Sequence, residues 1–464
     1  MTQVGAKPTK FDRSLIDGPL GSAVWRLAWP TMLQNAIAGL QFMIDQAMVG
    51  HYVGYTGNAA VGVSWQIILV VVAFISSLFT GMAVLVARFA GANDDQKVNR
   101  VVYQAFLTAI GLSIVMALVG YFGAPRLLDV INAAPEVQAQ ALPFLRAMFM
   151  GIFGMMTFFM LSSAFRAAGD PRTPLRLGIA MTAMTVTFNV ILIPRVGTIG
   201  AALGTIASST LIAVYGIWQF TRPESVIHFH RGMDRSLDLS VVRSLFRFGL
   251  PTGVQGIAMN VGGVLLLRFV GSLEQSAEAQ ASYAVCYSQL FSLITWTSNG
   301  LMGAAATMAG QNLGAGNPRR AARGVLVSSR IGIGVAAVVG ATFVLIPSYL
   351  LKIFGMTDPV VLALSRQLLM FLSVSGFFIT VALSYTGGLQ GTGDTKSPLY
   401  ISIVSQVIIP LGLCALFQMT RGLQPTDIWM AIVIGHVTRC TLSVARFRQQ
   451  KWRNIAVDIE AARP

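Results

Sequence analysis

Charged side chains are scarce in this chain, and acidic ones are the scarcest. Asp, Glu, Lys and Arg make up only 11% of the 464 residues, against 54% hydrophobic residues, and the mean hydropathy is +0.67. These values exclude an ordinary soluble globular protein and indicate a membrane protein that crosses the bilayer many times. Only three cysteines occur, without CxxC or metal-ligand spacing, so neither a disulfide framework nor a metal site is predicted.

Motifs for catalysis and for nucleotide binding are also missing. Lys396-Ser397 follows two glycines, but the GxxxxGK[ST] spacing of a phosphate loop is absent, which excludes a nucleotide-driven pump within this chain. No Ser-His-Asp or paired-carboxylate arrangement is visible, so we predict no catalytic residue, no enzyme activity and no cofactor. Residues 1–20 show no pattern of a cleavable signal, and the first hydrophobic segment is therefore expected to direct insertion.

Basic residues outnumber acidic ones by 33 to 18, which gives a net charge of +15. If the N-terminus is cytoplasmic, 26 of the 33 Lys and Arg fall on the cytoplasmic side or its helix ends and six on the opposite side. Only Arg268 is then assigned to the interior of a membrane segment. This split follows the positive-inside rule, so it indicates a lipid bilayer rather than nucleic acid as the partner, with both termini cytoplasmic.

Twelve hydrophobic segments are predicted, each long enough to cross a bilayer as a helix. They lie at residues 23–50, 58–87, 101–123, 138–165, 174–194, 197–221, 243–271, 280–311, 324–347, 360–389, 398–419 and 426–445. An even number of segments agrees with two termini on the same side of the membrane.

The two halves of the chain repeat each other. Four short matches occur in order at an offset of 221 or 224 residues. They pair WPT (29–31) with LPT (250–252), VG (49–50) with VG (270–271), FAGAN (89–93) with LGAGN (313–317), and FRAAGDPRTP (165–174) with LQGTGDTKSP (389–398). This pattern predicts an internal duplication. On this alignment Leu266 occupies the position of Asp45.

The repeat and the longest polar connection define the predicted domain organisation. It comprises a cytoplasmic N-terminal segment (1–22), an N-lobe with helices 1–6 (23–221), a cytoplasmic linker (222–242), a C-lobe with helices 7–12 (243–445) and a basic cytoplasmic tail (446–464). The predicted fold class is an all-α polytopic membrane protein. Its twelve transmembrane helices form two six-helix lobes related by a pseudo-two-fold axis along the membrane normal.

One stretch, residues 29–50, can cross a bilayer yet contains Asp45, which is the only acidic residue between positions 18 and 93. A charge at the bilayer centre costs about 2.5–3.5 kcal/mol on insertion scales, which favours a functional role. Helical spacing places Gln34, Gln41 and Asp45 in one polar stripe that suits a wet cavity. One alternative stays open: Asp45 could lie near the headgroups at the far end of the helix, without a task.

Other candidate site residues are polar or adaptable side chains inside hydrophobic segments. Asn189 and Thr185 share a helix face and could line a cavity or simply bond to neighbouring helices. Met155 belongs to a Met-rich segment, where thioethers can adapt to varied ligands but more often fill gaps. Tyr283 and Tyr287 could line a second polar wall of such a cavity.

Two prolines are predicted to act in gating. Pro30 and Pro251 occupy matching places in the repeat, and a proline inside a helix removes a backbone donor and can kink it. The repeated Gly-Asp pairs at 169–170 and 393–394 are typical of a turn followed by a helix cap, so a structural role is predicted for them.

Over about residues 20–445 the chain resembles the multidrug and toxic compound extrusion (MATE) transporters. The resemblance rests on the 6+6 layout, on Pro30 and Asp45 fifteen residues apart, and on the repeated small-residue and Gly-Asp motifs. The Asp45 helix is most similar to the DNA-damage-inducible (DinF-like) branch. The resemblance implies two lobes around a V-shaped cavity, efflux of cationic or amphipathic compounds coupled to inward H⁺ or Na⁺, and Asp45 as the coupling residue.

The sequence departs from the family at two positions. Some members carry a second acid where this chain has Ile193, and another branch carries a helix-7 Glu where this chain has Met259. The resemblance therefore implies that the second-half cation site of that branch is missing and that coupling falls on Asp45.

These observations predict a secondary active multidrug antiporter of a bacterial-type inner membrane, which is expected to be a monomer. It would export small organic, often cationic compounds in exchange for H⁺ by alternating access. Na⁺ is less favoured because a sodium site needs several oxygen ligands. A flippase for lipid-linked sugars stays an alternative, although it would need basic groups within the membrane beyond Arg268. A non-transporting receptor or membrane enzyme also stays an alternative.

Overall fold

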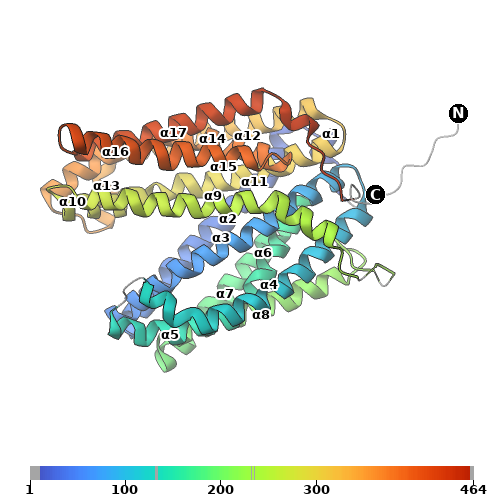
Figure 1. Cartoon of the computed structure of the whole chain (residues 1–464), viewed down its shortest axis with the longest axis horizontal. Coiled ribbons are helices and arrows are strands. Elements are labelled where there is room, and N and C mark those ends of the chain that lie inside the picture. Colours follow the sequence, from blue (N-terminus) through green and yellow to red (C-terminus); the bar gives the residue numbers. More distant parts are fainter. Residues whose placement is uncertain (1–10, 131–133, 231, 235, 460–464) are drawn as a thin grey trace. The chain divides into compact units, whose positions relative to one another are not determined.

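The computed structural model describes residues 11–130, 134–230, 232–234 and 236–459, and this part of the chain is helical without any strand (Figure 1). All twelve predicted segments are helical, apart from breaks of one residue. Within the described residues, nine helices are long and apolar enough to cross a membrane, and α5 (Pro135–Met150) with α6 (Ile152–Ala167), bent by 53°, would form a tenth.

The remaining two predicted segments are helical but less uniformly apolar. One is α2 (Leu20–Tyr52), which carries the polar stripe that includes Gln41 and Asp45. The other is divided into α10 (Ser276–Tyr283), the π-helix η1 (Ala284–Leu290) and α11 (Ser292–Gly314).

The described chain forms two compact units. The N-terminal unit spans Leu33–Gly253 with the chain ends, and the C-terminal unit spans Arg13–Met32 and Val254–Val457. The N-terminal unit holds α3 (Tyr55–Gly91), α4 (Asp95–Val130), α5, α6, α7 (Arg172–Val196) and α8 (Thr198–Phe220). The C-terminal unit holds α1 (Ser14–Asp17), α10, η1, α11, α12 (Pro318–Leu345), α13 (Pro347–Ile353), α14 (Pro359–Gly391), α15 (Lys396–Ile403), η2 (Val404–Ile408), α16 (Ile409–Thr420), α17 (Pro425–Arg448) and η3 (Lys451–Asn454).

Two long helices, α2 and α9 (Leu239–Gly271), are each divided between the units. The boundary follows Met32 in α2 and Gly253 in α9, in each case two residues after the repeated proline, Pro30 or Pro251. The six-helix lobes expected from the repeat do not include this exchange of helix halves, and their boundaries stay a prediction.

The packing of each helix half explains where it belongs. The first half of α2 contributes to one hydrophobic core with α1 and α11, formed by Leu15, Ala23, Val24, Leu27, Ala28, Leu301, Ala304 and Met308. The first half of α9 lies so close to α3 that a Cβ on Gly81 would be 2.0 Å from the carbonyl oxygen of Leu245. A Cβ on Gly249 would be 2.2 Å from that of Ser77, so only glycine permits this approach.

The repeated Gly-Asp turns have the same conformation in both units. Gly169 and Gly393 have φ of 96° and 97°, a left-handed region that favours glycine. Asp170 then accepts hydrogen bonds from the backbone amide and hydroxyl of Thr173, and Asp394 accepts the equivalent pair from Ser397. The predicted cap is therefore present twice, at the start of α7 and of α15.

The connection between α8 and α9 is anchored to α4. Gln104 donates to the carbonyl oxygen of Ser236 at 2.7 Å and accepts from the amide of Asp238 at 3.0 Å, while Arg100 pairs with the Asp238 carboxylate. Burial opposes ionisation of Asp238, but hydrogen bonds from Ser240 and the charge of Arg100 prevail and lower its pKa below the ordinary value. The linker is thus part of the N-terminal unit.

Candidate ion-coupling site

Asp45 is held by a side chain from a helix far along the sequence. Its Oδ1 accepts a hydrogen bond of 2.7 Å from Nδ2 of Asn189, which lies on α7 and is fully buried at 0% exposure. Asp45 itself is half-buried, so part of this residue stays accessible. Hydrogen bonds to an ionised acceptor are short and strong, which fixes the orientation of the carboxyl group.

The remaining members of the predicted polar stripe also face α7 and α6. Gln41 accepts a hydrogen bond of 2.7 Å from the hydroxyl of Thr182 on α7. Two turns earlier in the stripe, Gln34 accepts from the guanidinium of Arg166 on α6 at 3.3 Å. The stripe thus lies within the N-terminal unit as a row of polar contacts, with Asp45 as its only acidic member.

A glycine on α8 makes room for the Asn189 side chain. A Cβ at Gly204 would lie 2.0 Å from Oδ1 of Asn189, so any larger residue would displace the amide. Within the described structure this Oδ1 has no hydrogen-bond partner although it is buried. An unpaired buried polar atom carries a penalty of about 1–3 kcal/mol, which the fold accepts in order to point Nδ2 at Asp45.

Two other predicted residues of this unit serve packing. The Thr185 hydroxyl is buried and donates to the backbone carbonyl of Met181, four residues earlier, at 2.9 Å. Met155 is buried within α6 and contributes its thioether to the core. The structure therefore brings Gln34, Gln41 and Asn189 into the row beside Asp45, whereas a cavity-lining role for Thr185 and Met155 stays a prediction.

The arrangement around Asp45 can exchange a cation. Its hydrogen-bonding neighbours are neutral amides, and no Lys or Arg of the described chain forms an ion pair with it. Without a fixed counter-ion, the carboxylate is neutralised only by a proton or by a mobile cation. Such a group in a membrane-spanning protein is a candidate site for ion coupling or for binding of a cationic ligand.

Tyr283 and Tyr287 lie in the C-terminal unit, in a stack of aromatic rings. The ring centroids are 4.8 Å apart, and Trp429 stacks on Tyr283 at 6.4 Å. Phe291 continues the stack from Tyr287 at 5.6 Å and reaches the ring of His436 at 5.8 Å. The tyrosines thus belong to an aromatic stack within the C-terminal unit.

The expectation that Arg268 is the only arginine inside the membrane-spanning part is wrong. Arg439 lies within the α17 span and is only 2% exposed. Arg446 and Arg448 follow it closely, so the sequence of this segment is typical of an ordinary basic helix end. A second basic group within a membrane segment could thus hold part of a diphosphate, although a diphosphate carries more negative charge than one arginine can balance.

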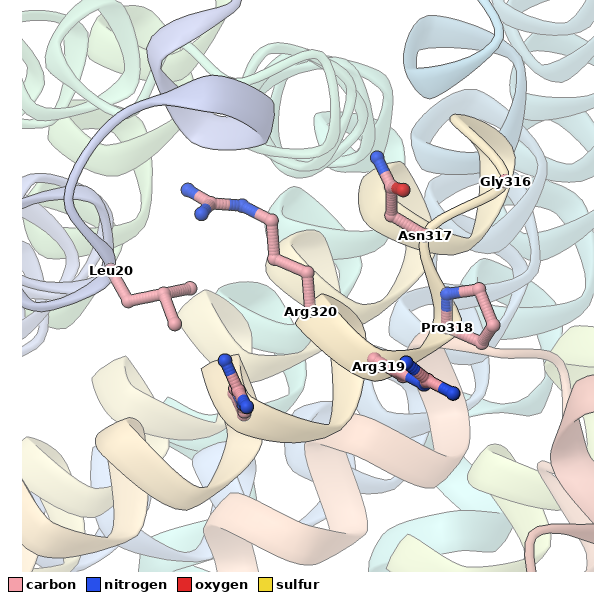
Figure 2. A pocket seen from close by; sticks show the side chains of 7 residues that line it. Leu20, Gly316, Asn317, Pro318, Arg319 and Arg320 are labelled. Atoms are coloured by element: carbon pink, nitrogen blue, oxygen red, sulfur yellow. The ribbon is translucent and has the colours of Figure 1, made fainter.

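A basic pocket of about 440 Å³ lies at the start of α12 in the C-terminal unit (Figure 2). It is lined by Leu20, Gly316, Asn317, Pro318, Arg319, Arg320 and Arg323. The side chain of Arg320 extends across it and donates to the carbonyl oxygens of Leu15 and Gly18. This arginine therefore ties the α1–α2 turn to α12, which is a structural role.

Metal-binding clusters are not found in the part of the chain that the structure describes. No group of three or more His, Cys, Asp or Glu side chains there is placed to hold a metal ion. The prediction that no metal is bound stays a prediction.

The long apolar helices, the isolated carboxylate and its amide partners define a membrane transporter. The MatE family profile matches residues 30–192 and 251–416, more than half of the chain, and each matched segment begins at one of the repeated prolines. The chain therefore belongs to the MatE family, that of the multidrug and toxic compound extrusion transporters, and it is a transporter rather than an enzyme.

Known proteins similar to this chain agree with that assignment. It is 25% identical to the probable multidrug resistance protein NorM of Thermotoga maritima, over 93% of each chain. An outward-facing multidrug resistance MATE transporter superposes with a TM-score of 0.89 at 19% identity, covering 96% of this chain and 98% of the other. A MOP superfamily transporter from Pyrococcus furiosus, described as having a binding pocket of reverse polarity, also has a TM-score of 0.89 at 19% identity and covers 97% and 100%. These likenesses confirm the predicted fold class.

Proposed function

We propose that this chain is a multidrug efflux antiporter that exports small organic, often cationic compounds in exchange for protons. The observation that carries the proposal is the half-buried Asp45 carboxylate, held by Asn189 and paired with no Lys or Arg among the residues that the structure describes. The names of the relatives as multidrug resistance proteins support the substrate class. The 26-to-6 distribution of Lys and Arg supports a bacterial-type inner membrane with both termini in the cytoplasm.

Coupling would arise from competition at one carboxyl group. Protonation of Asp45 removes the charge that attracts a cationic substrate, and binding of that substrate favours the ionised form and releases the proton. The Nδ2 of Asn189 can donate to Oδ1 in both states, because a protonated carboxyl keeps one oxygen free to accept. Alternating access would expose Asp45 to each side of the membrane in turn.

Protons are favoured over sodium because the amide oxygens near Asp45 are not directed at its carboxylate. The Oε1 of Gln41 already accepts from Thr182, and the Oδ1 of Asn189 faces Gly204 rather than the carboxylate. A sodium site needs several oxygen ligands around the ion, whereas one carboxylate suffices for a proton. The similarity of the Asp45 helix to the DinF-like branch also supports the assignment of this chain to that branch.

The test is transport by purified protein in liposomes, with an imposed pH or Na⁺ gradient and a permanently cationic fluorescent dye. Asp45→Asn mimics the protonated carboxyl and should abolish transport driven by the pH gradient, while Asp45→Glu should keep part of it. Glu136→Gln makes the same chemical change at an exposed carboxylate of the same unit and should leave transport intact.

Two results would overturn the proposal. Full pH-driven transport by Asp45→Asn would remove this residue from the mechanism. Transport that follows a Na⁺ gradient at fixed pH, and ignores a pH gradient, would replace the proton by sodium. Loss of the gene with altered lipid-linked products and unchanged efflux would favour the flippase instead.

A further inference from the structure

The interior of the C-terminal unit contains a charge that no described residue neutralises. The Arg439 side chain is 2% exposed, and its Nε is buried without a hydrogen-bond partner. No ion pair to Arg439 is formed by any acidic group in the described ranges. Because a guanidinium stays protonated in proteins, burial without a partner is costly, and an anion would relieve that cost.

Three other arginines of the C-terminal unit have partners, which Arg439 lacks among the described residues. Arg446, two turns further along α17, pairs with Asp394 at 2.9 Å. Arg421 pairs with Asp427, and Arg320 donates to backbone carbonyls of the α1–α2 turn. The fold thus neutralises or anchors these arginines, while it places Arg439 deeper and provides no counter-charge.

Two groups near Arg439 are the imidazole of His436 and the phenol of Tyr287. His436 lies one turn before it on the same buried face of α17, and the Nδ1 of His436 shares a hydrogen bond with the hydroxyl of Ser375 on α14. Phe291 stacks on the His436 ring, and Tyr287 lies within electrostatic range of the guanidinium. Tyr287 is only half-buried, so part of this residue stays accessible.

The helices that shape this region are irregular. Tyr287 sits in the π-helix η1, and a second π-helix, η2, packs against α17. Single π-helical turns are rare and frequently mark functional sites, because they reorient side chains that a regular helix would place elsewhere. Both π-helices of the described chain belong to the C-terminal unit, which also contains Arg439.

We infer that Arg439 is the receptor for the carboxylate of an aromatic compound, whose ring packs against the Tyr287–Phe291 stack. Guanidinium and carboxylate form paired, charge-assisted hydrogen bonds, and offset aromatic stacking supplies further affinity and selects for a ring. This inference rests on the proposed transport function and names a second substrate class, aromatic carboxylates and zwitterions, that a purely acidic site would repel.

The test uses equilibrium binding to the purified full chain in detergent, with three matched probes. The probes are 2-naphthoate, the neutral 2-naphthamide, and propionate, which has the carboxylate but no ring. We expect naphthoate to bind about tenfold more tightly than either of the others, because each lacks one of the two interactions. Arg439→Gln should remove the preference for naphthoate over naphthamide, and Arg439→Lys should restore only part of it because lysine lacks the planar fork.

Controls separate this inference from the coupling proposal. Arg448→Gln removes an exposed arginine of the same helix and should leave the preference unchanged. Asp45→Asn should lose proton-driven transport yet keep the naphthoate preference, while Arg439→Gln should keep pH-driven transport of the cationic dye. Dye transport by Arg439→Gln also shows that the variant is folded.

Three outcomes would overturn the inference. Equal affinity of the unmodified protein for naphthoate and naphthamide would show that no anion site exists, even if Arg439→Gln fails to fold. Retention of the preference in a folded Arg439→Gln variant would place the site elsewhere. Binding of propionate as tight as that of naphthoate would mean that Arg439 accepts small anions without recognition of a ring.

Discussion

The two units place opposite charges in their interiors. In the N-terminal unit the charge is the Asp45 carboxylate, and the Asn189 amide holds it. In the C-terminal unit it is the Arg439 guanidinium, and aromatic rings surround its neighbours. Leu266, the counterpart of Asp45 in the repeat, is buried in a hydrophobic core instead. Duplication has therefore preserved the backbone framework while the functional groups have diverged.

What the units share is the part that fixes the backbone. The Gly-Asp turns at Gly169 and Gly393 have nearly identical φ, and a proline precedes each point at which a long helix passes from one unit to the other. Turns and helix kinks constrain the chain in the same way in both halves, so both copies needed to keep them. A side chain at a binding site has no such constraint, and each half could specialise.

The largest effect should come from disturbing the frame around Asp45. Gly204→Ala would push a methyl group against the Asn189 amide and should reduce pH-driven transport about tenfold, which corresponds to roughly 1.4 kcal/mol. Gly111→Ala, at an open position on α4, is the matched control and should transport normally. Initial rates in proteoliposomes measure both variants.

A double-mutant cycle sharpens this prediction. In an Asn189→Ala background the clash is gone, so Gly204→Ala should cause little additional loss of transport. Equal and additive losses in both backgrounds would show that Gly204 acts through general packing, and that the acidic site of the N-terminal unit does not depend on its amide.

The two repeated prolines should differ in their effect on transport. We expect this effect to be smaller than that of Gly204→Ala. Pro30→Ala restores a backbone donor in the helix that carries Asp45 and should slow turnover about fivefold with little change in thermal stability. Pro251→Ala should slow it less, because α9 has Leu266 where α2 has Asp45. The two variants are compared by their dye-transport rates and by their melting curves in detergent. Unchanged turnover of a well-expressed Pro30→Ala protein would count against a mechanical role.

The smallest difference concerns stability at the two Gly-Asp turns. Asp394 caps α15 and also pairs with Arg446, so Asp394→Ala should lower the free energy of unfolding by about 2–3 kcal/mol. Asp170→Ala removes a helix cap and should lower the free energy of unfolding by about 1 kcal/mol. Melting temperatures of the two variants test the order. An equal loss would show that the Asp394–Arg446 pair adds nothing.

Much of the site in the N-terminal unit could be predicted because helical periodicity is local. The spacing of Gln34, Gln41 and Asp45 places them on one face whatever the rest of the chain does, and the structure finds all three facing α6 or α7. Arg439 escaped prediction because a basic residue near a helix end normally reaches water, and only the packing of α11, α14 and α17 shows that it is buried.

The sequence by itself determined the helical segments, the duplication and the isolated acid, since hydropathy, repeats and charge are properties of neighbouring residues. The tertiary structure decided which groups meet. It joined Asp45 to Asn189 across 144 residues, assigned the first half of α2 to the C-terminal unit, and enclosed Arg439 without a counter-charge. These outcomes depend on how distant helices pack, and close packing is specified by contacts between segments rather than by the composition of any one of them.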